Sequence, residues 1–348
     1  MLDLATLVVA FGLILLGAEL FTNAVEWFGH KLGVGEGAVG SVFAAVGTAL
    51  PETTIPIVAI VVSGGTSSDV GVGAILGAPF MLSTLALGVT GLVVLLAARR
   101  RTTGALLAVD RSVVRTDLRS FLPAYAIAIG SAFLPLDPTW PKLVVAVVLV
   151  ALYVLYVRSH LRAESIVDAE GLNPLRLRRL DWAVAHLVDD PPRLRVVVVQ
   201  VVVGLLAIVI GAVAFVAGVT NLARGFGIDE VLLALIVAPI ATELPEAANA
   251  VLWVRQGKDT LAIGNITGAM VFQASIATLS ALVLAPHEWT FRSGTEVAFA
   301  SSLIALLSTA AIVGPFAAGR SLRARGLLVG VGFYVAYLAV VAFAISTG

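Results

Sequence analysis

The 348-residue sequence contains no cysteine and few charged residues. Without cysteine it has no disulfide framework, no thiolate metal site and no cysteine nucleophile. Charged residues make up 13% of the chain and hydrophobic residues 59%, whereas soluble domains carry about 25% charged residues. The 22 Lys and Arg residues balance the 22 Asp and Glu residues, so no basic surplus indicates nucleic-acid binding. The composition excludes a soluble single-core enzyme and indicates a polytopic protein of the lipid bilayer.

Apolar stretches long enough to cross a bilayer recur along the chain and predict ten transmembrane helices in an all-α fold. The first stretch lacks a basic region before it and continues through Glu19 and Glu26. We therefore expect a membrane span there rather than a cleaved signal peptide. The expected spans are 4–28, 37–62, 71–97, 118–135, 141–157, 196–223, 230–254, 260–286, 296–316 and 326–346.

Basic residues gather in the connections that follow odd-numbered spans. With ten spans, these connections hold 19 of the 22 Lys and Arg residues, and only Lys142, Arg224 and Arg292 fall on the opposite side. Because positive charge favours the cytoplasmic side, we expect a cell-membrane protein with both termini extracellular or periplasmic. The connection at 158–195 is expected to be a cytoplasmic basic loop.

A short motif occurs twice. Residues 47–52 read GTALPE and residues 241–246 read ATELPE, while 73–78 read GAILGA and 264–269 read GNITGA. The offsets of about 190 residues place five spans in each half, so the second half enters the membrane with opposite polarity. The sequence therefore predicts two inverted five-helix repeats, 1–157 and 196–348, with motif regions at about 45–78 and 239–273. Inverted repeats are typical of secondary transporters.

Each motif places a glutamate in the middle of a span. Glu52 and Glu246 lie where a charged side chain costs about 2.5–3.5 kcal/mol. Pro51 and Pro245 precede them, and a proline leaves a backbone carbonyl without its helical donor. Two carboxylates at matching positions of an inverted repeat favour a substrate site over a structural kink.

Other oxygen donors accompany these glutamates. Thr48 and Thr242 lie one turn before them, which completes an oxygen cluster of the kind that Ca²⁺ and Na⁺ bind. Glu243 lies three residues before Glu246, so both can face one cavity. The motif glycines are expected to let neighbouring helices approach closely; they are Gly73, Gly77, Gly264 and Gly268.

Protons are candidate partners in this site. Three glutamates that face one empty cavity with no basic residue nearby cannot all stay ionised, so a cation that enters would displace protons. None of the four histidines (His30, His160, His186 and His287) lies inside an expected span, which leaves a glutamate as the expected proton carrier. Glu19 is a candidate second proton site, or alternatively a hydrogen-bonded packing residue near Asn23.

The paired GTALPE and ATELPE segments, each followed by a G-x-x-x-G segment, resemble the α-repeats of the Ca²⁺/cation antiporter superfamily, of the sodium/calcium exchanger type. The resemblance implies alternating access around a central acidic site. By position it implies Glu52 and Glu246 as the main metal ligands, Thr48 and Thr242 as further oxygen donors, and Asn265 as an amide ligand. Ala74 replaces the family's usual Asn or Asp in the first repeat, and Glu243 replaces a small hydroxyl residue.

We therefore expect a secondary active antiporter that exchanges Ca²⁺ for Na⁺ or H⁺, with inorganic cations as its partners and no cofactor. The sequence lacks the H-E-x-x-H motif of zinc proteases and places no aspartate pair within the expected spans, so we do not expect an enzyme. One alternative is a monovalent cation/H⁺ antiporter of the same fold. Another is a cation-selective channel, although an internal inverted repeat favours alternating access.

Overall fold

The computed structural model describes residues 2–49, 68–162, 172–178, 191–225, 243–292 and 295–347. Helices occur in these residues at every expected span, although the spans at 37–62 and 230–254 are described only in part. In chain order the helices are α1 (Leu2–Leu32), α2 (Glu36–Ala38), η1 (Val39–Ala44), α3 (Ala45–Thr48), α5 (Ser68–Met81), η2 (Leu82–Ala86), α6 (Leu87–Ala97), η3 (Ala98–Arg100), α7 (Arg111–Gly130), η4 (Ser131–Phe133), α8 (Trp140–Leu161), α9 (Leu194–Gly225), α12 (Leu244–Arg255), α13 (Asp259–Phe272), η8 (Gln273–Ala277), α14 (Thr278–Leu284), α15 (Glu296–Ile312), α16 (Gly314–Ala317), α17 (Ala324–Leu327) and α18 (Val329–Thr347).

Several of these helical runs have the length and apolar composition of membrane spans. Five reach the full length within the described residues: Thr6–Leu32, Ile75–Arg100, Trp140–Leu161, Leu194–Phe215 and Asp259–Leu284. Helix α7 begins seven residues before the expected span because the Asp110 side chain accepts a hydrogen bond from the N–H of Ser112 and caps the helix. The longer helix places Asp117 inside α7, where its side chain is fully buried.

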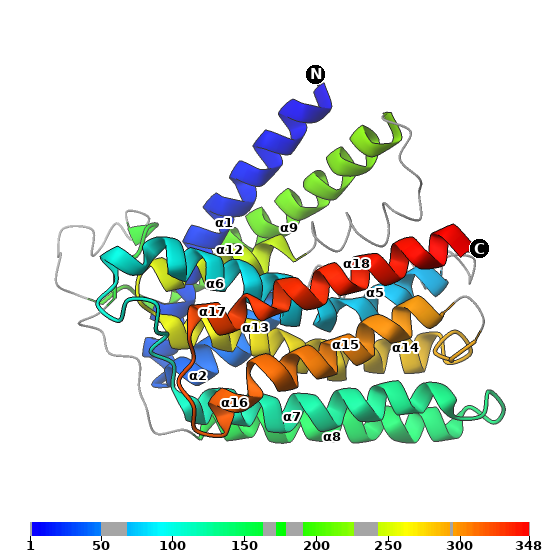
Figure 1. Cartoon of the computed structure of the whole chain (residues 1–348). Coiled ribbons are helices and arrows are strands. Elements are labelled where there is room, and N and C mark those ends of the chain that lie inside the picture. Colours follow the sequence, from blue (N-terminus) through cyan, green and yellow to red (C-terminus); the bar gives the residue numbers. More distant parts are fainter. Residues whose placement is uncertain are drawn as a thin grey trace.

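Helices α1 and α9 lie side by side and extend away from the other helices (Figure 1). The two helices are antiparallel, because residue numbers rise along α1 while those of the contacting residues fall along α9. Gly218 lies against Leu7, Gly211 against Ile14 and Gly204 against Phe21. These glycines let the two backbones approach closely. The first helices of the two halves, α1 and α9, therefore run in opposite directions, as inverted repeats require.

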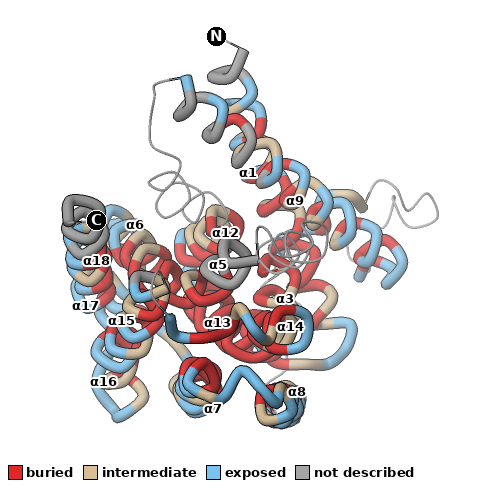
Figure 2. Tube along the Cα trace, turned by 90° about the vertical axis from the view of Figure 1, so that its right-hand side faces the viewer, coloured by how far each residue is buried: buried red, intermediate tan, exposed pale blue. Residues whose placement is uncertain are grey.

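Helix α13 lies at the centre of the molecule, and all 14 of its residues are buried (Figure 2). It packs against η1, α12 and α7. Its two motif glycines make the close approach that the sequence predicts. A Cβ atom at Gly268 would lie 2.2 Å from the Ser41 carbonyl oxygen, and one at Gly264 would lie 2.8 Å from Ser41 Oγ. In the first repeat, a Cβ atom at Gly77 would have no neighbour within 4 Å among the described residues. Residues 226–242, which correspond to the region around Ser41 by the repeat offset, lie outside them, so close approach at Gly77 stays a prediction.

Two π-helical segments repeat with the same spacing as the motifs. Segment η2 begins at Leu82 and η8 begins at Gln273, which is the 191-residue offset between Gly77 and Gly268. Each segment interrupts a long membrane helix directly after the G-x-x-x-G motif. Single π-helical turns occur often at functional sites because they redirect side chains locally.

Candidate cation site

Four of the six predicted cation ligands lie in the described residues, and Glu52 and Thr242 lie outside them. Thr48 ends α3 and is fully buried, with its hydroxyl bonded to the Ala44 carbonyl at 3.1 Å. Its Oγ1 also lies 3.4 Å from Asn265 Oδ1 on α13. The Asn265 amide in turn donates to the Glu246 carbonyl on α12 at 3.4 Å. The structure thus joins α3, α12 and α13 through predicted site residues.

Glu243 and Glu246 lie together at the beginning of α12. Pro245 occupies the first turn of this helix, where a proline costs no helical hydrogen bond. Glu246 is fully buried and Glu243 is 3% exposed. Their carboxyl groups are close enough to repel each other, and Gln273 forms a side-chain hydrogen bond with Glu243. The two carboxyl groups therefore face one buried polar centre, as the sequence predicts.

Some buried polar atoms at Glu243 and on α12 have no hydrogen-bond partner in the part of the chain that the structure describes. Glu243 Oε2 and both amide atoms of the fully buried Asn249 have no hydrogen-bond partner among the described residues. Leaving a buried polar group without a partner costs about 1–3 kcal/mol, and such groups in a native structure call for a ligand or water. No cluster of three or more Asp, Glu or His side chains occurs in the described ranges; the polar groups gathered here are carboxylates, amides and a hydroxyl.

The sequence reasoning missed Gln273 and did not select Asn249 as a site residue. Both are amides within membrane helices, and a polar side chain inside a span is itself a functional signal. Comparing the two repeats does not reveal Gln273, because the first repeat has Leu82 at the corresponding position. Asn249 lies one turn after Glu246 on α12.

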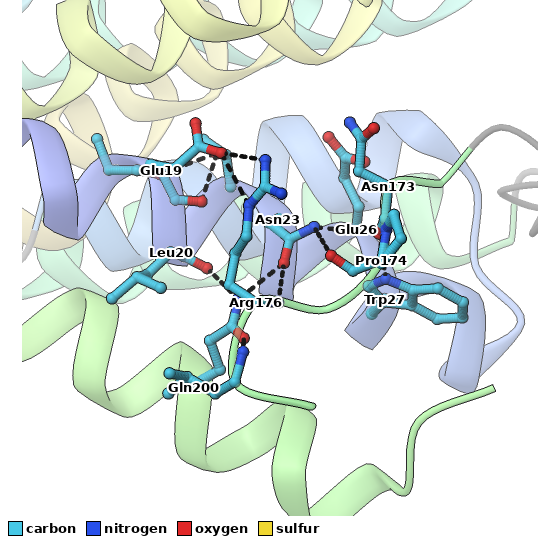
Figure 3. Close-up of polar contacts among 12 residues, drawn as sticks. Glu19, Leu20, Asn23, Glu26, Trp27, Asn173, Pro174, Arg176 and Gln200 are labelled. Carbon is cyan, nitrogen blue, oxygen red and sulfur yellow. Dashed lines mark hydrogen bonds and ion pairs between the residues drawn. The ribbon is translucent and has the colours of Figure 1, made fainter. Parts of the chain in front are cut away.

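Glu19 lies on α1 beside the segment 172–178 and does not join the glutamate centre (Figure 3). Its Oε1 forms a 2.7 Å salt bridge with Arg176 Nη2, and the two side chains are 34% and 48% exposed. Asn23 Oδ1 accepts the Arg176 backbone N–H at 3.1 Å, and Gln200 Oε1 accepts that of Leu177 at 2.7 Å. Glu19 and Asn23 thus bind the same connecting segment, and the proton-site role of Glu19 stays a prediction.

The expectation that no histidine lies inside a span is wrong. The span-length helix Thr6–Leu32 includes His30, and Trp140–Leu161 includes His160. His160 is only 3% exposed. The expected span ended at residue 157 because Arg158 and His160 lower the local hydropathy, but the helix continues to Leu161.

Antiparallel repeats around a buried polar centre are typical of secondary membrane transporters. The family described as sodium/calcium exchanger protein matches residues 2–160 and 196–346. The chain therefore belongs to the sodium/calcium exchanger family. It is a cation exchanger and a multi-pass membrane protein, and it is not an enzyme.

Related proteins agree with this assignment. The inner membrane protein YrbG of Escherichia coli (strain K12) is 27% identical over 288 residues, which cover 83% of this chain and 82% of that protein. The structure of the exchanger NCX_Mj soaked with 100 mM Na⁺ and 10 mM Sr²⁺ superposes with a TM-score of 0.71 at 18% identity. It covers 97% of this chain and 98% of that chain. The NCX_Mj structure without Na⁺ and Ca²⁺ gives a TM-score of 0.70. This likeness confirms the ten-helix fold in two repeats.

Proposed function

We propose that the chain exchanges Ca²⁺ for Na⁺ or H⁺ by alternating access at the buried centre between α3, α12 and α13. The observation that carries the proposal is the set of buried oxygen and amide groups there, of which Glu243 Oε2 and the Asn249 amide lack partners among the described residues. A hard cation satisfies such groups. The ions Na⁺, Ca²⁺ and Sr²⁺ soaked into NCX_Mj support a cation of this type.

In this proposal Glu246 and Glu52 are the main metal ligands, and Thr48, Thr242 and Asn265 supply further oxygens. Glu243 adds a carboxylate beside Glu246. Gln273 orients Glu243 through its hydrogen bond, and Asn249 offers an amide oxygen from the next turn of α12. The donor set draws on both repeats, so a movement of one repeat against the other changes access to the bound ion.

The adjacent carboxyl groups favour H⁺ as the coupling ion. Glu243 and Glu246 are both buried, and two neighbouring buried carboxyl groups that repel each other cannot both stay ionised in an empty site. Proton release on cation binding would keep the charge of the centre nearly constant. The same observation supports a second candidate, a monovalent cation/H⁺ antiporter, because a site with one exchangeable charge suits a monovalent ion.

We further propose that residues 1–157 and 196–348 act as the two repeats and that 158–195 is a cytoplasmic loop, with both termini on the other side. Single cysteines introduced at Thr103 and at a terminal residue test this orientation cleanly, because the chain has no native cysteine. A membrane-impermeant maleimide added to right-side-out vesicles should label the terminal cysteine and spare Thr103→Cys. Labelling in the reverse pattern would invert the orientation.

Calcium flux in proteoliposomes tests the function itself. Outward Na⁺ and H⁺ gradients are imposed separately, with Glu52→Gln and Glu246→Gln as site variants. Glu288→Gln is the matched control, because Glu288 pairs with Arg292 at the surface. Uptake under one gradient that both site variants abolish and the control retains would identify the coupling ion. No Ca²⁺ uptake under either gradient would refute Ca²⁺ as the substrate, and flux without a counter-gradient would indicate a channel.

A further inference from the structure

A second buried carboxylate lies outside the glutamate centre. Asp117 of α7 is fully buried, and four side chains surround its carboxyl group. Oδ2 accepts hydrogen bonds from Ser41 Oγ at 3.0 Å and Thr267 Oγ1 at 2.5 Å. Oδ1 accepts one from the Tyr156 hydroxyl at 3.1 Å and lies 2.8 Å from His160 Nε2. These four side chains lie at the acceptor positions of a carboxylate, which number about four, and the Tyr156 and Thr267 hydroxyls also lie within hydrogen-bond distance of the Ser41 and Ile263 carbonyls.

The contact with His160 determines which histidine nitrogen can titrate. Because an ionised carboxylate only accepts hydrogen bonds, Nε2 of His160 carries the hydrogen in this contact. Nδ1 is then the atom that gains or loses a proton, and it faces Gly37 of α2, where a Cβ atom would lie 3.0 Å away. His160 occupies the last turn of α8, and the negative end of a helix dipole favours an imidazolium. A protonated His160 balances the buried charge of Asp117.

Other charged groups near the pair are turned elsewhere. On α7, Arg111 and Arg115 donate to backbone carbonyls of residues 317–320, and Arg119 is exposed. On α8, Arg158 is exposed. Lys142 lies at the opposite end of α8 from His160 and donates to the Trp289 carbonyl. The elements that pack most closely on α7 and α8 bring three charged residues: Glu36 of α2, Asp259 of α13 and Glu296 of α15.

Each of these three residues has another environment. Asp259 forms a 2.5 Å salt bridge with Arg101, and Glu296 begins α15 at its first turn. Glu36 lies next to Gly37, on the side that His160 Nδ1 faces. Burial, and after it the negative charge of Glu26, raise the pKa of Glu36 above its usual value. Within the described residues His160 is thus the only histidine, lysine or arginine that contacts the Asp117 carboxylate.

The carboxylate joins the two helices that carry proposed cation ligands. Ser41 belongs to η1, which leads into α3 and Thr48, and Thr267 lies two residues after Asn265 on α13. Gly268 packs directly on the Ser41 carbonyl, and the Tyr156 hydroxyl lies 2.9 Å from the same carbonyl, between it and Asp117 Oδ1. The charge on Asp117 therefore holds a helix of the first repeat against a helix of the second.

We propose that Asp117 and His160 form a proton-binding site, separate from the cation site, whose protonation controls the junction of η1 with α13 and thereby the rate of transport. The rate control rests on the proposed cation exchange, whereas the proton site and its effect on the junction do not. Protonated His160 keeps Asp117 ionised and the junction closed. Loss of the Nδ1 proton leaves the buried carboxylate without a counter-charge and loosens the junction.

The proton site is tested first without transport. The protein is labelled with ¹⁵N-histidine and titrated by NMR over about pH 5–9, the range that brackets histidine titration. The chain has four histidines, so the signal lost in His160→Gln identifies His160. We expect this imidazole to be protonated at neutral pH in the wild type and to lose that protonation in Asp117→Asn. A His160 imidazole that is neutral at every pH would overturn the proposal.

Hydrogen exchange and flux then test the consequence. At a pH above the His160 titration, amides of residues 37–44 should exchange several-fold faster than below it, after normalisation to His160→Gln at the same pH. Cation flux should show a matching step that disappears in His160→Gln and persists in His287→Gln, an exposed histidine. Unchanged exchange would refute the control of the junction. If the wild type moves no cation at any pH, the proposed function fails, while the NMR and exchange results still decide the proton site and the junction.

Discussion

The two G-x-x-x-G segments occupy equivalent positions in the repeats but make different junctions. In the second repeat, Gly264 and Gly268 press against Ser41, and Thr267 bonds the charged Asp117. In the first repeat, no described residue lies within 4 Å of a Cβ atom placed at Gly77. There the neighbouring α15 packs against α5 and η2, and its side-chain hydrogen bonds to them among the described residues come from hydroxyl groups, Ser302 to the Leu76 carbonyl at 3.3 Å and Ser308 to Ser83 at 2.8 Å.

The difference shows that repeated sequence need not mean equal mechanical roles. A hydroxyl pair is a weak bond, worth about 0.5–1.5 kcal/mol, and it can be exchanged for others as helices slide. A buried carboxylate with four partners favours having all of its hydrogen bonds or none of them, because a partly hydrogen-bonded buried network is costly. The hydrogen bonds described at the second-repeat junction therefore hold α13 more strongly than those described at the first-repeat junction hold α5.

The largest effect should come from removing the charged member of the tight junction. In Asp117→Ala, the donors of Ser41, Thr267, Tyr156 and His160 lose their common acceptor, and breaking a buried ionic pair costs about 3–5 kcal/mol. Thermal unfolding in detergent measures this cost. Ser308→Ala is the matched variant at the other junction, with an expected cost of about 1 kcal/mol. Equal losses in the two variants would erase the distinction between the junctions.

The paired glycines offer the next contrast. In Gly268→Ala, the new methyl group would lie 2.2 Å from the Ser41 carbonyl oxygen, and relief of this overlap should cost about 1–3 kcal/mol. Gly77→Ala displaces no described residue and gains helix propensity, so its stability should be unchanged or higher by up to about 1 kcal/mol. Unfolding temperatures of both variants check this. A destabilised Gly77→Ala would mean that its surroundings are as tight as those of Gly268.

A smaller effect should follow when Asn265 of the second repeat is replaced by the residue found at the equivalent position of the first repeat. Asn265→Ala gives α13 the residue that Ala74 supplies in the first repeat. The variant loses the contacts to Thr48 and to the Glu246 carbonyl, and loss of one or two buried hydrogen bonds weakens binding about 5- to 50-fold. Isothermal titration with Ca²⁺ measures the dissociation constant. The exposed Asn221→Ala should bind as the wild type does; unchanged affinity in Asn265→Ala would remove Asn265 from the site.

The smallest effect is expected at Glu19, which pairs with the exposed Arg176. Glu19→Gln breaks the exposed pair with Arg176, which should cost under about 1 kcal/mol and change flux by less than about twofold. Flux driven by a H⁺ gradient, with Arg176→Gln as the matched variant, measures this. If Glu19→Gln alone lost H⁺-driven flux, Glu19 would be a proton carrier after all.

The sequence allowed much of the site to be predicted, because its signals are local. A proline followed by a glutamate inside an apolar run is visible in a few residues, and its recurrence at Glu246 reveals the repeat. Gln273 lacked such a counterpart and was missed. Asp117 and His160 were assigned outside the spans, because a hydropathy average ends where arginines begin, although the helices themselves continue.

By itself, the sequence determined the membrane class, the helical spans and the pairing of the two motifs, since each depends on composition and on spacing along the chain. Only the tertiary structure decided which motif glycines are in tight contact, that a connecting segment binds Glu19, and that Asp117 meets partners from three other helices. These partners lie between 39 and 150 residues away along the chain. Contacts at such separations depend on how helices pack, which no local pattern of residues encodes.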